Sequence, residues 1–363
     1  MKYLLTLLLL FGTVVGRART ADVPPPAADG AGKTLEELSA EIEALKEKSS
    51  GWEKLLARMP KVSGYLSLGY EWSDDGTSSF YVKRVRMSLS GELVPKLDYR
   101  FQIEFAAPKV LDVYLRYRPF TQLNVKLGQY KIPFSIENTE YAPLKFEFIE
   151  YPLALTRMMG FSETVGDKSL RASGRELGAT LYGGFFERDG YCILNYDLSL
   201  FNGAGLNTKD DNKSKDVAAR LIVRPLPGLQ IAGSFYRGEA GTEYLKRLRY
   251  GAGACYDEGP VVVRGEWIGG ETGIQGSKST FRSSGWYAMG GWRVLPSLMP
   301  VARYDTLLAN TDQASSRQTN YTLGMVWQPR KFLRFHLCYT YEDYKISATN
   351  NRNVVQTMIY AAF

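Results

Sequence analysis

Basic side chains recur at alternate positions in several short segments of the sequence, and their chemistry is that of anion binding. In the segment 79–93, Arg84 and Arg86 alternate with Val85, Met87 and Leu89. A guanidinium group holds a phosphate or a carboxylate in a planar fork, whereas a lysine ammonium acts as a mobile point charge. The basic residues that we predict to share one face, and to select anions together, are Arg84, Arg86, Arg100, Arg116, Arg118, Lys126, Arg220, Arg224, Arg264 and Arg303.

Other reactive side chains give weaker patterns. Glu104, Asp112, Glu266 and Asp305 alternate onto the same face and partly cancel its charge. The single histidine, His336, has no serine and acid partner nearby, so we expect no enzymatic activity. The three cysteines, Cys192, Cys255 and Cys338, do not have the spacing of a metal site or of a disulfide framework, although one disulfide stays open. We expect no cofactor and no metal ion.

The alternation itself predicts β-strands with two different environments on their faces. A soluble sandwich also alternates, but its outer face is usually a mixture of small and polar residues. In a membrane barrel the apolar face meets lipid and the other face lines water, and an arginine on the lipid face costs about 2–4 kcal/mol at the midplane. A slip of one residue in the segment 79–93 would place two arginines in lipid. No internal run is long enough for a membrane helix, so a membrane protein of this sequence must be a closed sheet.

We predict an all-β fold, a 16-stranded antiparallel transmembrane β-barrel over residues 61–363. Alternate connections between its strands are short and turn-like, and those between them are mostly longer, which is typical of an outer-membrane barrel. The predicted strands are Val62–Trp72, Ser79–Leu93, Leu97–Ala106, Val110–Arg118, Gln122–Lys131, Glu176–Phe186, Tyr191–Phe201, Lys215–Arg224, Leu229–Arg237, Lys246–Tyr256, Val261–Gly269, Phe281–Val294, Leu298–Leu308, Thr319–Gln328, Phe332–Asp343 and Asn353–Phe363.

The longest connection, residues 132–175, has three prolines and six aromatic residues. Loops of this length usually have a function. Because it has aromatic side chains that can pack against a wall, we expect it to fold inward and to narrow the pore. An external flap is the alternative.

The residues before the barrel form three further regions. Residues 1–21 have a charged start, an apolar core and small residues at the end, the pattern of a signal peptide. Residues 22–32 form a proline-rich linker. Residues 33–59 place apolar side chains at heptad spacing, which predicts a short helical coiled-coil arm, either between chains or packed on its own body. An even strand number places this arm in the periplasm.

Three passages resemble the phosphate-selective porins O and P. The basic residues Lys83, Arg84 and Arg86 match the arginine-rich second strand of that family. The run Gly128, Gln129, Tyr130, Lys131, with Pro133 and Phe134, matches its Gly-Gln-aromatic-Lys-x-Pro-Phe motif, and Pro300 to Asp305 match a further segment. The resemblance implies a sixteen-stranded barrel, usually a trimer of separate pores with a basic lumen. The terminal Phe363, after alternating apolar residues, also resembles the signal read by the barrel-assembly machinery of Gram-negative bacteria. That signal often has an aromatic residue at the third position from the end, where this sequence has Ala361, and its tyrosine stands one place earlier, at Tyr360.

From these observations we predict a trimeric outer-membrane porin of a Gram-negative cell, surrounded by lipid and passing small hydrophilic solutes by diffusion. The net charge of +7 resides in the barrel part and favours anions such as phosphate. Two alternatives stay open, a non-selective diffusion porin and a structural anchor that acts as a tether through the N-terminal helix. No nucleic-acid partner is expected.

Overall fold

The computed structural model of the protein describes residues 39, 43, 59–141, 143–170, 173–346 and 349–363. The chain divides into two compact units, Met1–Ala57 and Arg58–Phe363. The predicted signal peptide (1–21) and linker (22–32) lie outside the described residues. So does the predicted coiled-coil arm (33–59), except for Ser39 and Glu43, which are helical, and Met59.

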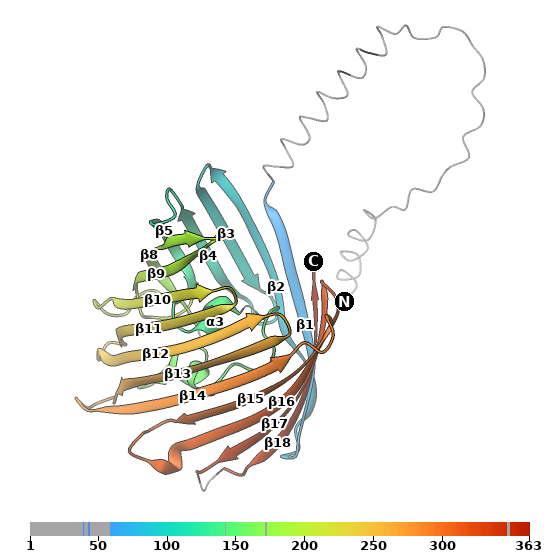
Figure 1. The fold of residues 1–363 in the computed structure, drawn as a ribbon. Coiled ribbons are helices and arrows are strands. Elements are labelled where there is room, and N and C mark those ends of the chain that lie inside the picture. The colour runs from blue at the N-terminus through green and yellow to red at the C-terminus, as the bar shows by residue number, and fades with distance from the viewer. Residues whose placement is uncertain (1–38, 40–42, 44–58, 142, 171–172, 347–348) are drawn as a thin grey trace, which may run out of the picture. The chain divides into compact units, whose positions relative to one another are not determined.

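The second unit is a closed antiparallel barrel of sixteen strands, with a two-stranded sheet, β6–β7, inside one connection (Figure 1). The barrel strands are β1 (Lys61–Ser73), β2 (Ser78–Val94), β3 (Leu97–Glu104), β4 (Lys109–Tyr117), β5 (Asn124–Lys131), β8 (Arg175–Arg188), β9 (Tyr191–Phe201), β10 (Asp216–Leu226), β11 (Leu229–Ala240), β12 (Leu245–Glu258), β13 (Val261–Gly273), β14 (Thr280–Trp292), β15 (Leu298–Leu308), β16 (Arg317–Arg330), β17 (Leu333–Tyr344) and β18 (Arg352–Ala362). Strands that follow each other in the sequence pair with each other, except that β5 pairs with β8 across the long connection. The ring closes where β1 pairs with β18. The sixteen predicted barrel strands are therefore confirmed, with ends that differ by a few residues.

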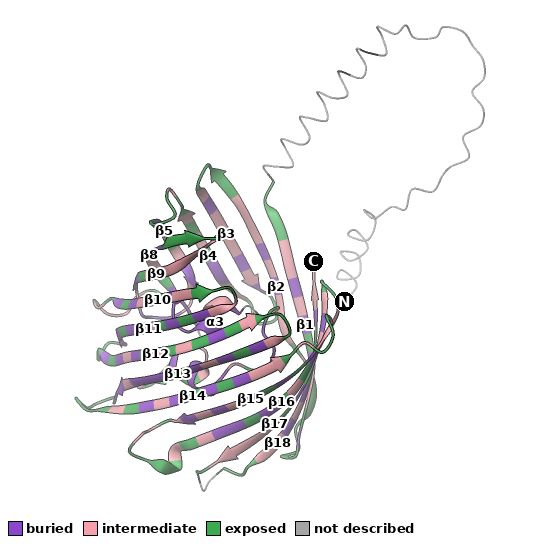
Figure 2. Cartoon of the chain, in the orientation of Figure 1, coloured by how far each residue is buried: buried purple, intermediate pink, exposed green. Residues whose placement is uncertain are grey.

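The two faces of the wall differ in chemistry, as the alternation predicted. On β16, for example, Tyr321, Leu323 and Met325 are exposed on the outside, whereas Asn320 and Thr322, which precede Tyr321 and Leu323, are buried. The bands of exposed and buried residues alternate along the strands in Figure 2. A barrel with apolar residues outside and polar residues inside matches the two environments of a membrane and an enclosed lumen.

Aromatic side chains gather on the outer surface. Trp286, Tyr304, Tyr321 and Tyr341 lie on four successive strands, β14 to β17, and their neighbouring ring centroids are 4.8, 5.3 and 6.3 Å apart. Rows of tyrosine and tryptophan of this kind are typical of the membrane–water interface of a barrel. Among the described residues, no helix is long and apolar enough to cross a bilayer.

The long connection between β5 and β8 contains α3 (Ile136–Glu140), α4 (Leu153–Met158), β6 (Glu163–Val165) and β7 (Lys168–Leu170). It lies within the ring of strands in Figure 1. Phe134, Phe148 and Leu155 are buried in apolar clusters that also contain inward-facing residues of the wall. The connection is thus held by apolar packing inside the barrel.

The three cysteines of the barrel are free thiols. Cys255 and Cys338 are buried, and Cys192 is half-buried. The disulfide that the sequence left open does not form in this structure.

Candidate functional site in the barrel lumen

Two adjoining cavities lie between the inner wall and the long connection, and we call them the wide cavity and the narrow cavity. The wide cavity, about 500 Å³, is lined by strands β1 to β5, β8 to β10 and β18, by Phe363, and by Pro133, Thr139, Pro143 and Leu144 of the connection. The narrow cavity, about 210 Å³, is lined by Arg84, Arg86, Lys131 and Arg175 on the wall side, and by Pro143, Glu150, Tyr151, Thr156, Phe161 and Ser173 of the connection. Arg86, Lys131, Pro143 and Arg175 line both cavities, so the two spaces meet there.

A β-bulge brings two consecutive basic residues of β2 to the lumen. Ser67 of β1 pairs with Arg84, and the next residue, Leu68, pairs with Val82, so Lys83 is the extra residue. A bulge of this kind re-aims a side chain that strict alternation would point to the other face. As a result Lys83 forms an ion pair with Glu150 of the connection, while Arg84 lines the narrow cavity.

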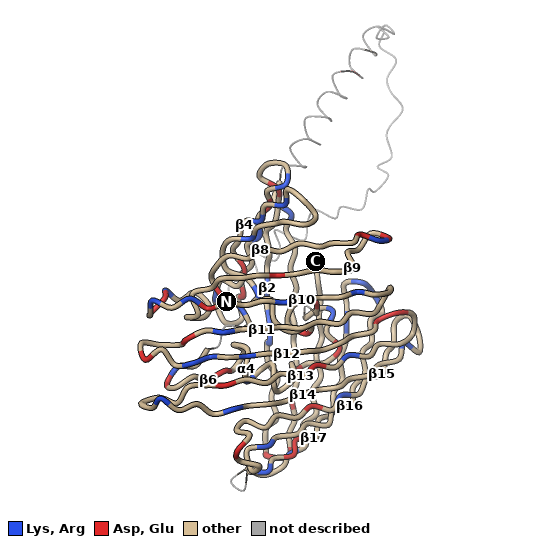
Figure 3. Tube along the Cα trace, turned by 60° about the vertical axis from the view of Figure 1, so that its left-hand side comes forward, with Lys and Arg blue, Asp and Glu red and all other residues tan. Residues whose placement is uncertain are grey.

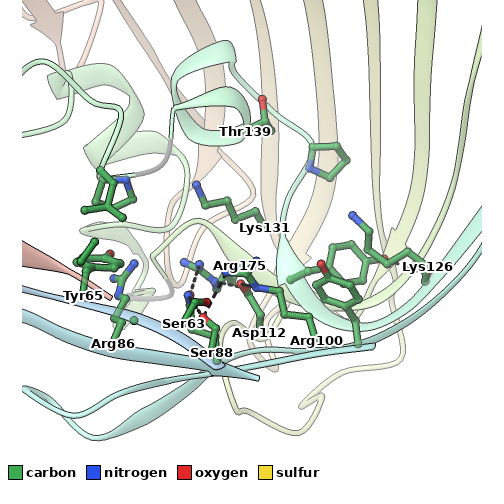
Figure 4. A pocket seen from close by; sticks show the side chains of 18 of the residues that line it. Ser63, Tyr65, Arg86, Ser88, Arg100, Asp112, Lys126, Lys131, Thr139 and Arg175 are labelled. Carbon is green, nitrogen blue, oxygen red and sulfur yellow. Dashed lines mark hydrogen bonds and ion pairs between the residues drawn. The ribbon is translucent and has the colours of Figure 1, made fainter. Parts of the chain in front are cut away.

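Lys131 and Arg175 stand at the two ends of the long connection and face each other across the β5–β8 ladder. Arg175 is buried and donates from Nε to Asp112 at 2.6 Å, and Nε of Arg100 approaches the same carboxylate at 3.5 Å. Figure 4 shows the two arginines beside Asp112 and Lys131 projecting into the space between the wall and Thr139. Sequence reasoning did not select Lys131 or Arg175 as site residues. Their position as the cations that flank the long loop is the signal that could have found them.

The backbone conformation at Gly128, the glycine of the motif that resembles the porin family, explains why a glycine stands there. Gly128 has φ +128°, a conformation that other residues rarely adopt, and a Cβ there would lie 2.2 Å from the Val113 carbonyl oxygen. The backbone of β5 therefore approaches β4 closely just before Lys131 turns into the long connection.

Lys126 and Arg220 complete the basic lining of the wide cavity. The Lys126 ammonium lies 4.8 to 5.4 Å from the ring centroids of Tyr114, Tyr130 and Tyr182, contacts in the range of cation–π interactions. Arg220 donates to Asp197 and to Glu140 of α3, each at 3.0 Å, and contacts Thr139. The Lys126 ammonium thus contacts aromatic rings, whereas the Arg220 guanidinium forms ion pairs with two carboxylates.

Three of the predicted arginines pair with carboxylates on the wall itself. Arg86 Nε lies 2.8 Å from Glu104, and Arg86 also lines both cavities. Arg116 and Arg118 lie 3.0 and 2.8 Å from the two oxygens of Asp98. Neither Arg116 nor Arg118 lines the wide or the narrow cavity. Charges of both signs are interleaved along the strands, as Figure 3 shows.

The last three predicted arginines lie elsewhere. Arg224 contacts Asn195 and lines a separate cavity of about 540 Å³ beside the β10–β11 turn. Arg303 donates to the backbone carbonyl of Glu150 at 2.8 Å and stacks on Phe148, with 4.5 Å from Cζ to the ring centroid. Arg264 is 1% exposed and is enclosed between the wall and the long connection. The structure therefore places Arg264 away from both cavities.

Arg264 and two neighbouring acids of the wall hold the connection in place. Its guanidinium lies 2.5 Å from Glu137 and 2.6 Å from Glu147. Glu266 accepts from Ser135 Oγ at 2.8 Å and from the backbone N–H of Ile136 at 2.6 Å, at the start of α3. Asp305 accepts from the N–H of Leu153, where α4 begins. Of the four acids that we expected to weaken the basic field, Glu266 and Asp305 thus bind the connection, whereas Glu104 and Asp112 pair with arginines of the wall.

A second anchor fixes the hairpin β6–β7 to β12. The buried carboxylate of Glu163 accepts from Arg247 at 2.9 Å and from Arg249 at 2.7 Å. Burial opposes ionisation of Glu163, but the two arginines outweigh it and hold the pKa of this carboxyl below its ordinary value. At the first anchor, burial raises the pKa of Glu137, although Arg264 acts in the opposite direction.

Basic side chains outnumber side-chain carboxylates in both the narrow and the wide cavity. Four basic side chains and one carboxylate, Glu150, line the narrow cavity, and six basic side chains and two carboxylates line the wide cavity. Within the described residues no group of histidine, cysteine, aspartate or glutamate could hold a metal ion. The arrangement can attract, orient and release small anions.

A closed sixteen-stranded barrel with an apolar exterior, a charged lumen and an inward-folded loop defines the class of membrane channels known as porins. The family model for the phosphate-selective porins O and P matches residues 65–230 and 237–362, and the chain belongs to this family. It is therefore an outer-membrane channel for small solutes. The family and the fold are those of channels, and the resemblance seen in the sequence is confirmed.

Solved structures show the same fold at low sequence identity. An anion-selective porin from Comamonas acidovorans has a TM-score of 0.65 at 14% identity, over 84% of this chain and 99% of that chain. The trimer form of OmpT from Vibrio cholerae has a TM-score of 0.60 at 13% identity, over 84% and 99%. The outer-membrane channel DcaP of Acinetobacter baumannii has a TM-score of 0.58 at 13% identity, over 84% and 97%. A comparison with curated protein sequences found no match.

Proposed function

We propose that this porin prefers anions, phosphate or ions similar to it, and passes them by diffusion. The observation that carries the proposal is the excess of cations in the narrow cavity, where Arg84, Arg86, Lys131 and Arg175 face a single carboxylate. In a confined space with low-dielectric walls such an excess raises the local concentration of anions. The anion-selective porin from Comamonas acidovorans, which has the same fold, supports the proposal.

The connection of residues 132–175 is the element that we propose to narrow the pore. Its contacts with Glu266, Arg264 and Asp305 join it to the β13–β15 side of the wall. The narrow cavity lies on the opposite side of the connection, against β2, β5 and β8. A permeating ion is therefore directed past the basic side chains of the narrow cavity.

We also propose a homotrimer. The strands β3 and β5 have eight residues each, fewer than the roughly nine to eleven that a tilted strand needs to cross the hydrocarbon layer, whereas β12 has fourteen. A wall that is too short to span lipid is best covered by another protein subunit. The trimer form of OmpT supports this assembly. The N-terminal arm would then lie in the periplasm, where three copies can associate.

The chain end supports a role in assembly of the barrel. The backbone of Phe363 exchanges two hydrogen bonds with Gly64, at 2.9 and 3.0 Å, so β18 closes the ring at the final residue. Phe363 is 73% exposed. We propose that this strand is the segment that the barrel-assembly machinery binds.

A reversal potential measured in a planar bilayer under a salt gradient tests the preference for anions. Arg84→Gln combined with Lys131→Gln lowers the net side-chain charge of the narrow cavity from +3 to +1. The reversal potential should move toward that of a non-selective pore in this variant. Arg118→Gln is the matched control, because Arg118 is paired with Asp98 outside both cavities. A cation-selective wild type would refute the proposal.

A non-selective diffusion porin is the second candidate. It is favoured by the ion pairs of Arg86, Arg116 and Arg220, which neutralise much of the basic face. A reversal potential near zero in the wild type would select this candidate.

A further inference from the structure

The narrow cavity has two chemically different walls. One wall carries the four basic side chains, and the other carries Tyr151 and Phe161 of the long connection, which we call the aromatic pair. Both rings are partly exposed, and their centroids are 4.7 Å apart at an interplanar angle of 45°. A hydrated inorganic anion can accept hydrogen bonds from the basic wall and from the hydroxyl groups of Tyr151, Thr156 and Ser173, but it gains nothing from the ring faces, because an aromatic face carries negative charge.

Buried residues of the long connection pack against the aromatic pair and fix its position. Phe146, which is 2% exposed, stacks on Tyr151 with centroids 4.9 Å apart and an angle of 22° between the rings. Tyr151 and Phe161 also pack against the buried cluster that contains Leu153 and Leu155 of α4. The two rings are therefore presented to the cavity in fixed positions, which lowers the entropic cost of stacking a ligand on them.

The basic wall retains capacity for a ligand. The Nη1 atom of Arg84 is buried and has no hydrogen-bond partner among the described residues. Arg86 uses its Nε atom for Glu104. Arg175 donates from all three of its guanidinium nitrogen atoms, to Asp112, to the backbone carbonyl of Ser173 and to Gln102. Guanidinium groups can bind a carboxylate through two parallel hydrogen bonds when their remaining nitrogen atoms are free to turn toward it.

The same combination of side chains continues into the wide cavity. There Tyr65, Tyr114 and Tyr130 share the lining with Arg100 and Lys126. A solute that carries both a negative charge and a flat apolar group therefore meets matching surfaces along both spaces. Inorganic phosphate has no apolar group that could stack on the ring faces.

We propose that the channel favours organic anions in which a carboxylate is joined to a flat aromatic ring. The carboxylate lies against Arg84 and Arg86, and the ring stacks on the aromatic pair. This inference rests on the proposed preference for anions and names the class of solute.

Block of the chloride current through the full-length channel in a planar bilayer tests the inference. Sodium benzoate, sodium acetate and sodium phosphate serve as the probes, and acetate is the non-aromatic monocarboxylate that matches benzoate in charge. Because one aromatic contact strengthens binding by about 0.5–1.5 kcal/mol, benzoate should block at a concentration about 2- to 10-fold lower than acetate. This comparison needs only the wild-type protein.

The variants Tyr151→Leu and Phe161→Leu should remove the difference between benzoate and acetate and leave the reversal potential anion-selective. Phe185→Leu is the matched control, since Phe185 is an exposed ring on the outer surface of β8. Equal block by benzoate and acetate in an anion-selective wild type would overturn the inference and leave the proposed function standing. A cation-selective wild type would overturn both.

Discussion

Replacing Arg264 tests whether the long connection is held in the lumen by its buried ion pairs. The guanidinium is enclosed and lies within 2.6 Å of two carboxylates, Glu137 and Glu147, and its Cζ stands 3.6 Å from the Tyr141 ring centroid. Arg264→Met would leave both acids buried without their counter-charge. Removal of one partner from a buried ion pair costs about 3–5 kcal/mol.

The substitution should destabilise the docked position of the connection and not the barrel wall. The barrel closes through sixteen backbone strand pairings, which do not depend on the Arg264 side chain. A loss of about 3–5 kcal/mol shifts the equilibrium between docked and released connection by roughly 10²- to 10³-fold or more. The segment around α3 should therefore leave the lumen, and the single-channel conductance and the current noise should rise. Resistance of the folded barrel to unfolding in detergent confirms that the wall is intact.

The triple variant Arg264→Met, Glu137→Gln and Glu147→Gln serves as the control, since neutralising all three groups removes the unpaired charges. Replacement of a whole buried ion pair is often nearly neutral, so the triple variant should recover most of the wild-type conductance. A folded Arg264→Met channel with wild-type conductance and noise would refute the reasoning that the ion pairs hold the connection.

Three further predictions concern other parts of the barrel. Glu150→Gln removes the one carboxylate that lines the narrow cavity, so phosphate should block the chloride current at a lower concentration than in the wild type; an unchanged blocking concentration would show that Glu150 does not compete with the anion. Because the pKa of Glu163 is lowered below its ordinary value of 4.5, its contribution to docking is present at neutral pH and is lost as the pH falls below 4.5, and current noise should rise in that range; constant noise would count against the anchor. Leu115→Lys on the short wall should dissociate the trimer in native mass spectrometry, whereas Leu323→Lys on β16 should leave it trimeric and destabilise the barrel by about 2–4 kcal/mol if the residue lies near the midplane; the opposite pattern would place the subunit contact elsewhere.

The architecture of the wall could be predicted from the sequence because two opposed solvents leave a strong pattern. Each strand must direct apolar residues to lipid and polar residues to water, and alternate connections differ in length. These constraints act within single strands and connections, so the strands and their two faces can be recognised directly in the sequence. Both the strand number and the assignment of faces follow from them.

The lumen could be predicted only in part, because a sequence pattern shows which face a charge occupies and not which charge it meets. Arg84 and Arg264 both alternate onto the inner face, yet Arg84 lines a cavity and Arg264 is enclosed by Glu137 and Glu147 of a segment more than a hundred residues away. The bulge at Lys83 breaks the alternation on which the inference relied. The partners of each arginine depend on where the long connection packs, and that is a property of the folded barrel.

Anomalous diffraction from crystals grown in sodium bromide tests the central claim most directly, because it locates anions in the lumen. We predict a bromide peak in the narrow cavity, in contact with Arg84, Arg86, Lys131 or Arg175. A narrow cavity without bromide, in crystals that show bromide beside Arg118 or Arg224, would contradict the claim that this part of the wall selects anions.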